Sequence, residues 1–150
     1  MITVVDAKTW HCGQMVRQLR AEDRDGALAC GVDAHHELRR RLDASAIARA
    51  VLIDGRLAAL GGLIGTILAR ESWVWLVVAP WAIRRNARAL GRLAVIYVGS
   101  FMQLRHGLYA TIFAGDIKAA RLVEFLGFKD CGERMPHGRG ELAVWHLTRD

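Results

Sequence analysis

The first part of the chain combines a short β-branched run with apolar residues at helical spacing. Residues 2–5 have the sequence ITVV, which is typical of a strand. Asp6 follows at a position where a carboxylate can cap a helix. We predict that this helix turns inward the side chains of Met15, Val16 and Leu19, because they lie three and four residues apart.

Two more helical segments are predicted before the centre of the chain. One ends at Gly31, because glycine commonly ends helices. The next begins after Asp33, a favourable capping residue, and places Leu38 and Leu42 four residues apart on one face. The pattern up to this point therefore predicts a strand and two or three short helices.

The centre of the chain has the pattern of three consecutive strands. Residues 47–53 and 56–64 are mostly apolar, and between them lies Asp54-Gly55, a strong hairpin signal. A pair of glycines is expected to loosen the second strand. Residues 72–78 (SWVWLVV) are almost all apolar, as in a strand that is covered on both faces.

A longer helical pattern follows Pro80, which is expected to end the third strand. We predict a loop over residues 79–83 and a long helix over residues 84–105, with arginines crowding its first two turns. One apolar stripe along this helix comprises Leu90, Ala94, Tyr97, Val98, Phe101 and Leu104.

The last third of the chain continues with strand, helix and two strands. Residues 108–114 form the predicted strand, and Asp116 caps a helix that ends at Gly127. Residues 128–133 and 142–147 are the final strands, with a turn-rich segment between them. The order of elements predicts an α/β (α+β) fold, with a mixed, mainly antiparallel central sheet flanked by helices.

Composition supports one folded domain over residues 1–150. The chain is 53% hydrophobic and 24% charged with only 2 prolines, which excludes a disordered or collagen-like protein. The longest charge-free segment, residues 57–69, is shorter than the roughly 18 apolar residues of a membrane span. The start of the chain lacks the pattern of a secretory signal, so we expect a cytoplasmic protein. The three cysteines are far apart, and no metal site is predicted.

The positive charge of the chain is concentrated in one segment. Between Arg84 and Arg121 there are seven basic residues and one acidic residue, so this segment accounts for the whole net charge of +6. Its arginines lie where a strand passes into a helix, and exposed N–H groups at a helix start favour a phosphate. Solvated arginines on an amphipathic helix are the alternative interpretation.

The segment from Asp116 to Phe128 (DIKAARLVEFLGF) resembles a motif of the Gcn5-related N-acetyltransferases (GNAT). The family pattern is Asn-x-x-Ala-x-x-Leu-Tyr-x-x-x-Gly-Phe, and Ala119, Leu122 and Gly127 match it at the right spacing, as does Phe128. Upstream, RRNARA from Arg84 is similar to the pyrophosphate loop, Arg/Gln-x-x-Gly-x-Gly/Ala. The resemblance covers most of the chain.

The GNAT resemblance implies acetyl-coenzyme A as cofactor and an amine as acyl acceptor. The residues implied to bind the cofactor are Val77, Val78, Arg84, Ala87, Arg88, Ala89, Asp116 and Ala119. Glu71 is the carboxylate near the start of the fourth strand that such enzymes use as general base.

Three positions depart from the family pattern. Asp116 replaces Asn, and Ala87 replaces the glycine that lets the backbone approach the pyrophosphate. Val123 replaces the tyrosine that protonates the leaving thiolate, and valine has no proton to donate. The predicted activity is therefore acetyl transfer with a degenerate cofactor loop, weak or lost.

A narrower resemblance leaves a second hypothesis open. The order of segments is also similar to small acetyltransferase-like proteins from the assembly gene clusters of short-tailed bacteriophages. That resemblance implies a non-catalytic internal virion or assembly protein, with virion proteins as partners, in the host cytoplasm or the virion. A nucleic-acid binder is the least favoured hypothesis, because no recognisable module supports it. A homodimer is an open alternative, since late strands are expected to be exposed.

Overall fold

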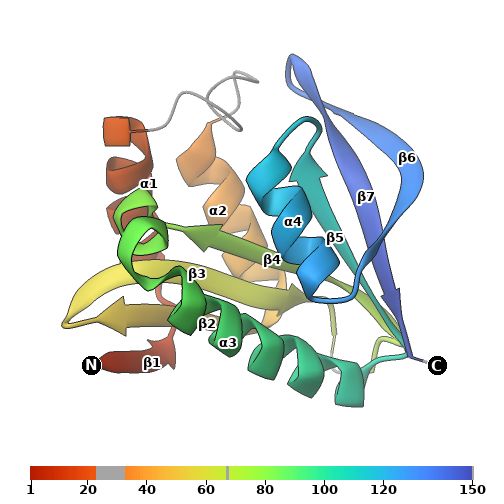
Figure 1. Ribbon diagram of the computed structural model, residues 1–150, viewed down its shortest axis with the longest axis horizontal. Helices are drawn as coiled ribbons and strands as arrows, with labels where there is room; N and C mark the ends of the chain where they lie inside the picture. The colour runs from red at the N-terminus through yellow and green to blue at the C-terminus, as the bar shows by residue number, and fades with distance from the viewer. Residues whose placement is uncertain (23–32, 67, 150) are drawn as a thin grey trace.

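The computed structural model describes residues 1–22, 33–66 and 68–149, and its strands and helices follow one another in the predicted order (Figure 1). In chain order they are β1 (Ile2–Asp6), α1 (Thr9–Glu22), α2 (Ala34–Ala44), β2 (Ser45–Ile53), β3 (Arg56–Ile64), β4 (Glu71–Val78), α3 (Pro80–Leu104), β5 (Gly107–Phe113), α4 (Ile117–Phe125), β6 (Lys129–His137) and β7 (Gly140–Thr148).

The strands form one seven-stranded sheet in the order β1-β2-β3-β4-β5-β7-β6. Neighbouring strands are antiparallel except for β4 and β5, which are parallel and are joined by α3 as a crossover helix. A parallel pair needs such a long connection, whereas hairpins suffice elsewhere. The predicted fold class, a mixed and mainly antiparallel sheet with flanking helices, is confirmed.

Each face of the sheet is covered by its own pair of helices. Buried residues of α1 and α2, among them Met15 and Leu38, pack against β2 and β3. On the other face Phe101 of α3 and Val123 of α4 pack against Leu108 of β5. In Figure 1 the helices α3 and α4 lie nearer the viewer than the sheet, and α1 and α2 lie behind it. The prediction that Met15, Val16 and Leu19 face inward is confirmed.

The start of α3 differs from the prediction. The segment 79–83, predicted as a loop, is helical from Pro80 onward, because proline is favoured at the first position of a helix, where its missing N–H is not needed. The helix is interrupted at Asn86, whose φ of −129° and ψ of 21° are not helical. Leu104, predicted to belong to the apolar stripe, is 56% exposed at the last position of the helix.

Local capping signals are mostly confirmed. Asp33 accepts hydrogen bonds from the backbone of α2, and Asp116 does so from α4. Asp6, however, does not cap α1: it ends β1, and its carboxylate forms an ion pair with Arg49 at 2.7 Å. The helical segment predicted to end at Gly31 lies outside the described residues.

The glycine pair of β3 allows a close approach rather than a loosened strand. A Cβ atom on Gly62 would lie 2.5 Å from the carbonyl oxygen of Ile47 and 2.8 Å from Nε1 of Trp75. A Cβ atom on Gly61 would lie 2.9 Å from the carbonyl oxygen of Trp75. With glycine at both positions, the Trp75 indole has room to donate a hydrogen bond to Ser45 Oγ at 2.8 Å. The glycines thus make room for the Trp75 residue of β4.

No helix in the described ranges is long and apolar enough to cross a membrane.

Candidate functional site

The central feature of the sheet is the divergence of β4 from β5. Their ladder joins Glu71–Val74 to Gly107–Ala110 and goes no further. Beyond Val74, β4 stays paired with β3, whereas β5 continues beside β7. Figure 1 shows the two strands separating beyond this point. An opening therefore lies in the sheet beside residues 75–78 of β4.

The opening exposes backbone groups of β4 on the side that faces away from β3. Residues 75–78 are paired with β3 on their other side, and alternate residues of a strand direct N–H and C=O to opposite neighbours. Half of these residues therefore present both groups toward the opening. Val77 and Val78, predicted from the sequence to bind a cofactor through the backbone, lie on this edge.

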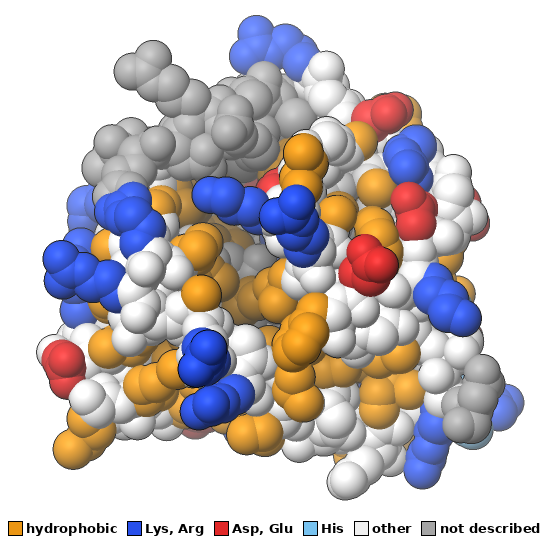
Figure 2. Space-filling model, in the orientation of Figure 1, with side chains coloured by type: hydrophobic (Ala, Val, Ile, Leu, Met, Phe, Trp, Pro, Cys, Tyr) orange, Lys and Arg blue, Asp and Glu red, His pale blue; other side chains and the backbone are white. Residues whose placement is uncertain are grey.

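A hollow lies between α3 and α4 on the face that both helices cover. Figure 2 shows a hydrophobic floor in this hollow, with Lys and Arg side chains around its rim. The basic residues of the two helices are exposed, and they are Arg84, Arg85, Arg88 and Arg92 of α3 and Lys118 and Arg121 of α4. Most of the positive charge that the sequence places between Arg84 and Arg121 is therefore exposed on these two helices, where charges of one sign reinforce each other.

The interruption at Asn86 gives α3 a second helix start next to this hollow. The residues after it, Ala87–Ala89, begin the long part of the helix. Backbone N–H groups at a helix start lack carbonyl partners in the preceding turn, so they are available to an anion. Arg84 and Arg88 lie on either side of the interruption. Together with Ala87 and Ala89, they are four of the residues that the sequence predicts to bind a cofactor, and all four lie in this short segment.

The start of α4 is partly occupied by its own cap. The Asp116 carboxylate accepts a hydrogen bond from the Ala119 N–H at 3.1 Å, so these two predicted residues bind each other. Val123, at the position where the resemblance places a tyrosine, is 8% exposed and packs in the core with Phe101 and Phe128. Position 123 therefore serves packing.

Glu71 lies at the closed end of the β4–β5 ladder. It is three residues before Val74, which corresponds to roughly 10 Å along a strand. Burial, and next the charge of Glu71 and hydrogen bonding with its carboxylate, raise the pKa of Tyr109. The prediction of Glu71 as a general base stays a prediction, and the acceptor amine would have to compete with Tyr109 for it.

Sequence reasoning missed the neighbours of Tyr109. Its ring stacks on that of His146 with centroids 4.1 Å apart and planes 8° apart, and Trp73 lies 5.1 Å away. Nε2 of His146 is buried and has no hydrogen-bond partner in the described part of the chain. The pairing of Tyr109 with His146 follows from the β5–β7 register, which no local signal in the sequence specifies.

Metal-ligating side chains and cysteines are further candidates for chemistry in the described part of the chain. Within residues 1–22, 33–66 and 68–149, no group of three or more His, Cys, Asp or Glu side chains is placed to hold a metal ion. Cys12 is a buried free thiol, and Cys131 is an exposed one.

Comparison with known proteins gives structural matches alone. No family model matches the sequence, and no curated protein matches it either. Among solved structures, the ribosomal-protein-S18-alanine N-acetyltransferase from Escherichia coli is similar, with 17% identity, a TM-score of 0.71 and coverage of 99% of this chain and 94% of that one. An acetyltransferase of the GNAT family from Bacillus anthracis has 11% identity, a TM-score of 0.68 and coverage of 98% and 94%.

A third structure was solved with a bound cofactor. The ribosomal L7/L12 α-N-protein acetyltransferase in complex with coenzyme A has 7% identity, a TM-score of 0.71 and coverage of 98% and 93%. At identities this low the likeness shows the fold, and this chain has the GNAT fold. These structures give no support to the resemblance to bacteriophage assembly proteins, which stays a prediction.

Proposed function

We propose that this protein is an acetyl-coenzyme A-dependent N-acetyltransferase. The observation that carries the proposal is the opening beside residues 75–78 of β4, the strand that is followed directly by α3 with its second helix start after Asn86 and its exposed arginines. The GNAT fold of the chain supports it, because the similar structures are acetyltransferases. An unpaired strand edge and a cationic helix start are the two features that a long amide-containing, phosphorylated cofactor requires.

The residues present fit coenzyme A along its length. Val77 and Val78 would bind the pantetheine arm through backbone groups, as an added strand binds a sheet edge. Arg84, Ala87, Arg88 and Ala89 would hold the pyrophosphate, and Asp116 and Ala119 would border it from α4. When bound, acetyl-coenzyme A supplies an acetyl group activated as a thioester.

Catalysis in this site would rest mainly on positioning. The backbone edge and the basic rim fix one reactant, so an amine that enters the opening meets it at high effective concentration. Val123 donates no proton, and the Glu71 carboxylate is already engaged by Tyr109. We therefore expect turnover to be slower than in an enzyme with a dedicated acid and base, and each absent group costs about 10²–10⁴-fold.

Calorimetric titration with acetyl-coenzyme A tests the proposal. We expect micromolar binding that Arg84→Ala and Arg88→Ala each weaken by about 10- to 100-fold, since a charge-assisted hydrogen bond contributes about 1.5–3 kcal/mol. Arg139→Ala, which removes an exposed arginine from the turn between β6 and β7, should leave the affinity unchanged. Binding that survives both α3 substitutions, or no heat up to millimolar ligand, would refute the proposed site.

The alternative function is a non-catalytic assembly protein that keeps the GNAT fold. It rests on Ala87 and Val123, whose side chains depart from the family pattern at the cofactor loop and at the acid position. This alternative predicts no heat with acetyl-coenzyme A and no acetylation of any amine. If binding occurs, a screen of peptide, polyamine and aminoglycoside amines with acetyl-coenzyme A identifies the acceptor class.

A further inference from the structure

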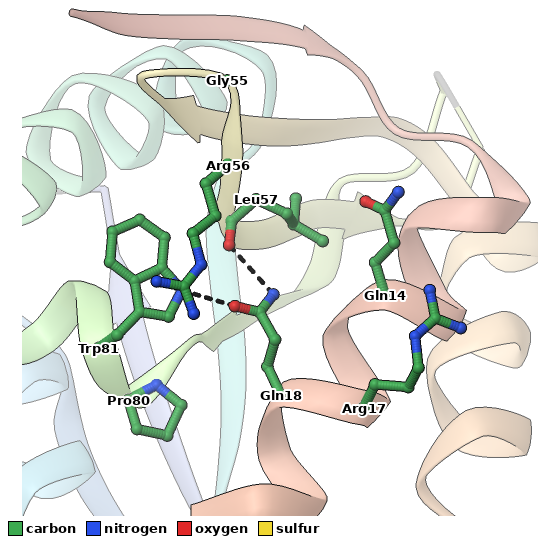
Figure 3. A pocket seen from close by; sticks show the side chains of 8 residues that line it. All are labelled: Gln14, Arg17, Gln18, Gly55, Arg56, Leu57, Pro80 and Trp81. Atoms are coloured by element: carbon green, nitrogen blue, oxygen red, sulfur yellow. Dashed lines mark hydrogen bonds between the residues drawn. The ribbon is translucent and has the colours of Figure 1, made fainter.

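A cavity of about 470 Å³ lies outside the proposed cofactor site, where α1, the β2–β3 turn and the start of α3 meet. Its polar lining comprises Gln14, Arg17 and Gln18 of α1, Arg56 after the turn and Trp81 of α3. Figure 3 shows Arg17 and Arg56 on opposite sides of this space, with Gln18 between them. The volume is in the range that small-molecule sites occupy.

The floor of the cavity is held by a hydrogen-bonded amide. Gln18 accepts a hydrogen bond from Nε1 of Trp81 at 2.5 Å and donates one to the carbonyl oxygen of Leu57 at 3.1 Å (Figure 3). This side chain thereby links α1, β3 and α3 and fixes the orientation of the Trp81 ring. The Arg56 guanidinium lies over that ring, 4.3 Å from its centroid. Arg56 is thus held in one place before any ligand arrives.

The cations of the cavity have unused hydrogen-bonding capacity. In the described part of the chain, Arg17 and Arg56 form no ion pair or hydrogen bond, and the Gln14 amide forms none either. The carboxylate of Asp54, in the β2–β3 turn, is engaged by the N-terminal amine. Stacking on a ring leaves the N–H groups at the edge of a guanidinium free to bind an oxyanion.

We propose that this cavity binds a small molecule that is acidic at both ends, a dicarboxylate or a bisphosphate. One acidic group binds the Arg56 guanidinium above Trp81, and the other binds Arg17 on the opposite side, within reach of Gln14. The apolar middle of the ligand lies over Leu57 and Pro80. Two separated cations with a neutral amide between them favour two separated anionic groups over a single one.

Matched ligands test the requirement for two acidic groups. Adipate has a carboxylate at each end, hexanoate has one, and fructose 1,6-bisphosphate has a phosphate at each end. We expect adipate or the bisphosphate to bind at least tenfold more tightly than hexanoate in calorimetry, and to shift the indole N–H resonance of Trp81 in a ¹H–¹⁵N spectrum. The tighter of the two identifies the acidic group, and either result supports the proposal.

Three variants locate the two ends of the ligand. Arg17→Gln should lower the affinity for the two-ended ligand about tenfold, to that of hexanoate, whereas Arg56→Gln should weaken both kinds of ligand. Arg139→Gln removes an equal charge elsewhere on the surface and should change neither. The proposal would be overturned by equal affinities for adipate and hexanoate, or by no saturable binding at about 10 mM. It would also be overturned if Arg139→Gln lowered the affinity as much as Arg17→Gln or Arg56→Gln.

Competition with acetyl-coenzyme A separates this cavity from the proposed cofactor site. The two-ended ligand should keep its affinity when acetyl-coenzyme A is present in excess, and Arg88→Ala should leave it unchanged. Displacement by acetyl-coenzyme A would show that the cavity belongs to the cofactor site and would overturn the assignment of a separate ligand. The readouts need no enzymatic activity, so their failure leaves the acetyl-transfer proposal standing.

Discussion

Replacement of Arg105 by methionine should destabilise the closed end of the β4–β5 ladder. Arg105 is 3% exposed, and its guanidinium donates hydrogen bonds to neutral oxygens of at least three described residues. The acceptors are the Thr66 carbonyl at 2.6 Å, Ser72 Oγ at 2.8 Å and the Leu104 carbonyl at 3.0 Å. They belong to the segment before β4, to β4 itself and to the end of α3. One side chain therefore connects the three segments at the point where the opening closes.

The expected loss of unfolding free energy follows from the buried acceptors that the substitution leaves without a donor. A buried acceptor without a donor costs about 1–3 kcal/mol, so three of them amount to roughly 3–9 kcal/mol. Methionine fills much of the volume, and the desolvation of a buried guanidinium, worth several kcal/mol, is avoided. We expect the free energy of unfolding to fall by about 2–4 kcal/mol, within the range measured when one partner of a buried polar cluster is removed.

Urea unfolding followed by circular dichroism measures this change. Arg149→Met, which removes an exposed arginine close to the end of β7, is the control and should change the unfolding free energy by less than about 0.5 kcal/mol. Arg105→Lys keeps the charge but has fewer donors, so its loss should be intermediate. A loss below about 1 kcal/mol for the methionine variant would show that these hydrogen bonds do not hold the ladder end.

Three further predictions concern pH, packing and charge. Burial, and next the charge of Lys8, lower the pKa of His11, whose Nδ1 accepts the Lys8 N–H at 2.8 Å. Because the unfolded chain then binds the proton more readily, stability should be full above pH 6.5 and fall by up to about 1.4 kcal/mol per pH unit below it. In urea unfolding His11→Asn should lose this slope, and an unchanged slope would contradict the assignment. Gly62→Ala should destabilise the protein by at least about 2 kcal/mol in thermal unfolding, since its Cβ would meet the backbone at 2.5 Å. Gly99→Ala, with open space around it, is the control and should stabilise α3 by about 0.5–1 kcal/mol. Equal shifts for the two variants would refute the close approach at Gly62. Asp116→Asn keeps the cap of α4 and removes a negative charge beside the basic rim, so acetyl-coenzyme A should bind a few-fold more tightly in calorimetry, and weaker binding would contradict this placement.

Signals of a few neighbouring residues were enough to predict most helices, strands and turns. The candidate site, in contrast, depends on which strands pair in the sheet. Asp33 and Asp116 bind N–H groups two or three residues away, and Asp54-Gly55 completes its turn with positive φ at both residues, so each is specified by a few residues. The opening depends on β5 leaving β4 to follow β7, whose residues lie some thirty positions later in the chain. Pro80 was misassigned because the same residue that ends a strand also begins a helix.

The cavity at Trp81 and the ring contacts of Tyr109 could not be predicted from the sequence, for the same reason. Gln18, Leu57 and Trp81 have no common motif, and only the packing of three elements brings them together. The interruption at Asn86 is likewise not indicated by the apolar stripe, which begins only at Leu90. By contrast, the charge count identified the basic rim, because exposed arginines keep their charge wherever the chain folds.

Binding and catalysis make different demands on side chains in this fold. In the proposed cofactor site, the β4 edge and the helix start after Asn86 would bind through backbone groups, so alanine at position 87 would be tolerated where its Cβ has space. Proton donation needs a particular side chain, and Val123 is packed among Phe101 and Phe128, where a tyrosine would overfill the core at a cost of about 1–3 kcal/mol. Restoring tyrosine at this position would therefore test packing before it tests catalysis. The same reasoning predicts that, if the proposed site binds the cofactor, the part of the affinity that comes from backbone groups is less sensitive to substitution than a rate that depends on one hydroxyl.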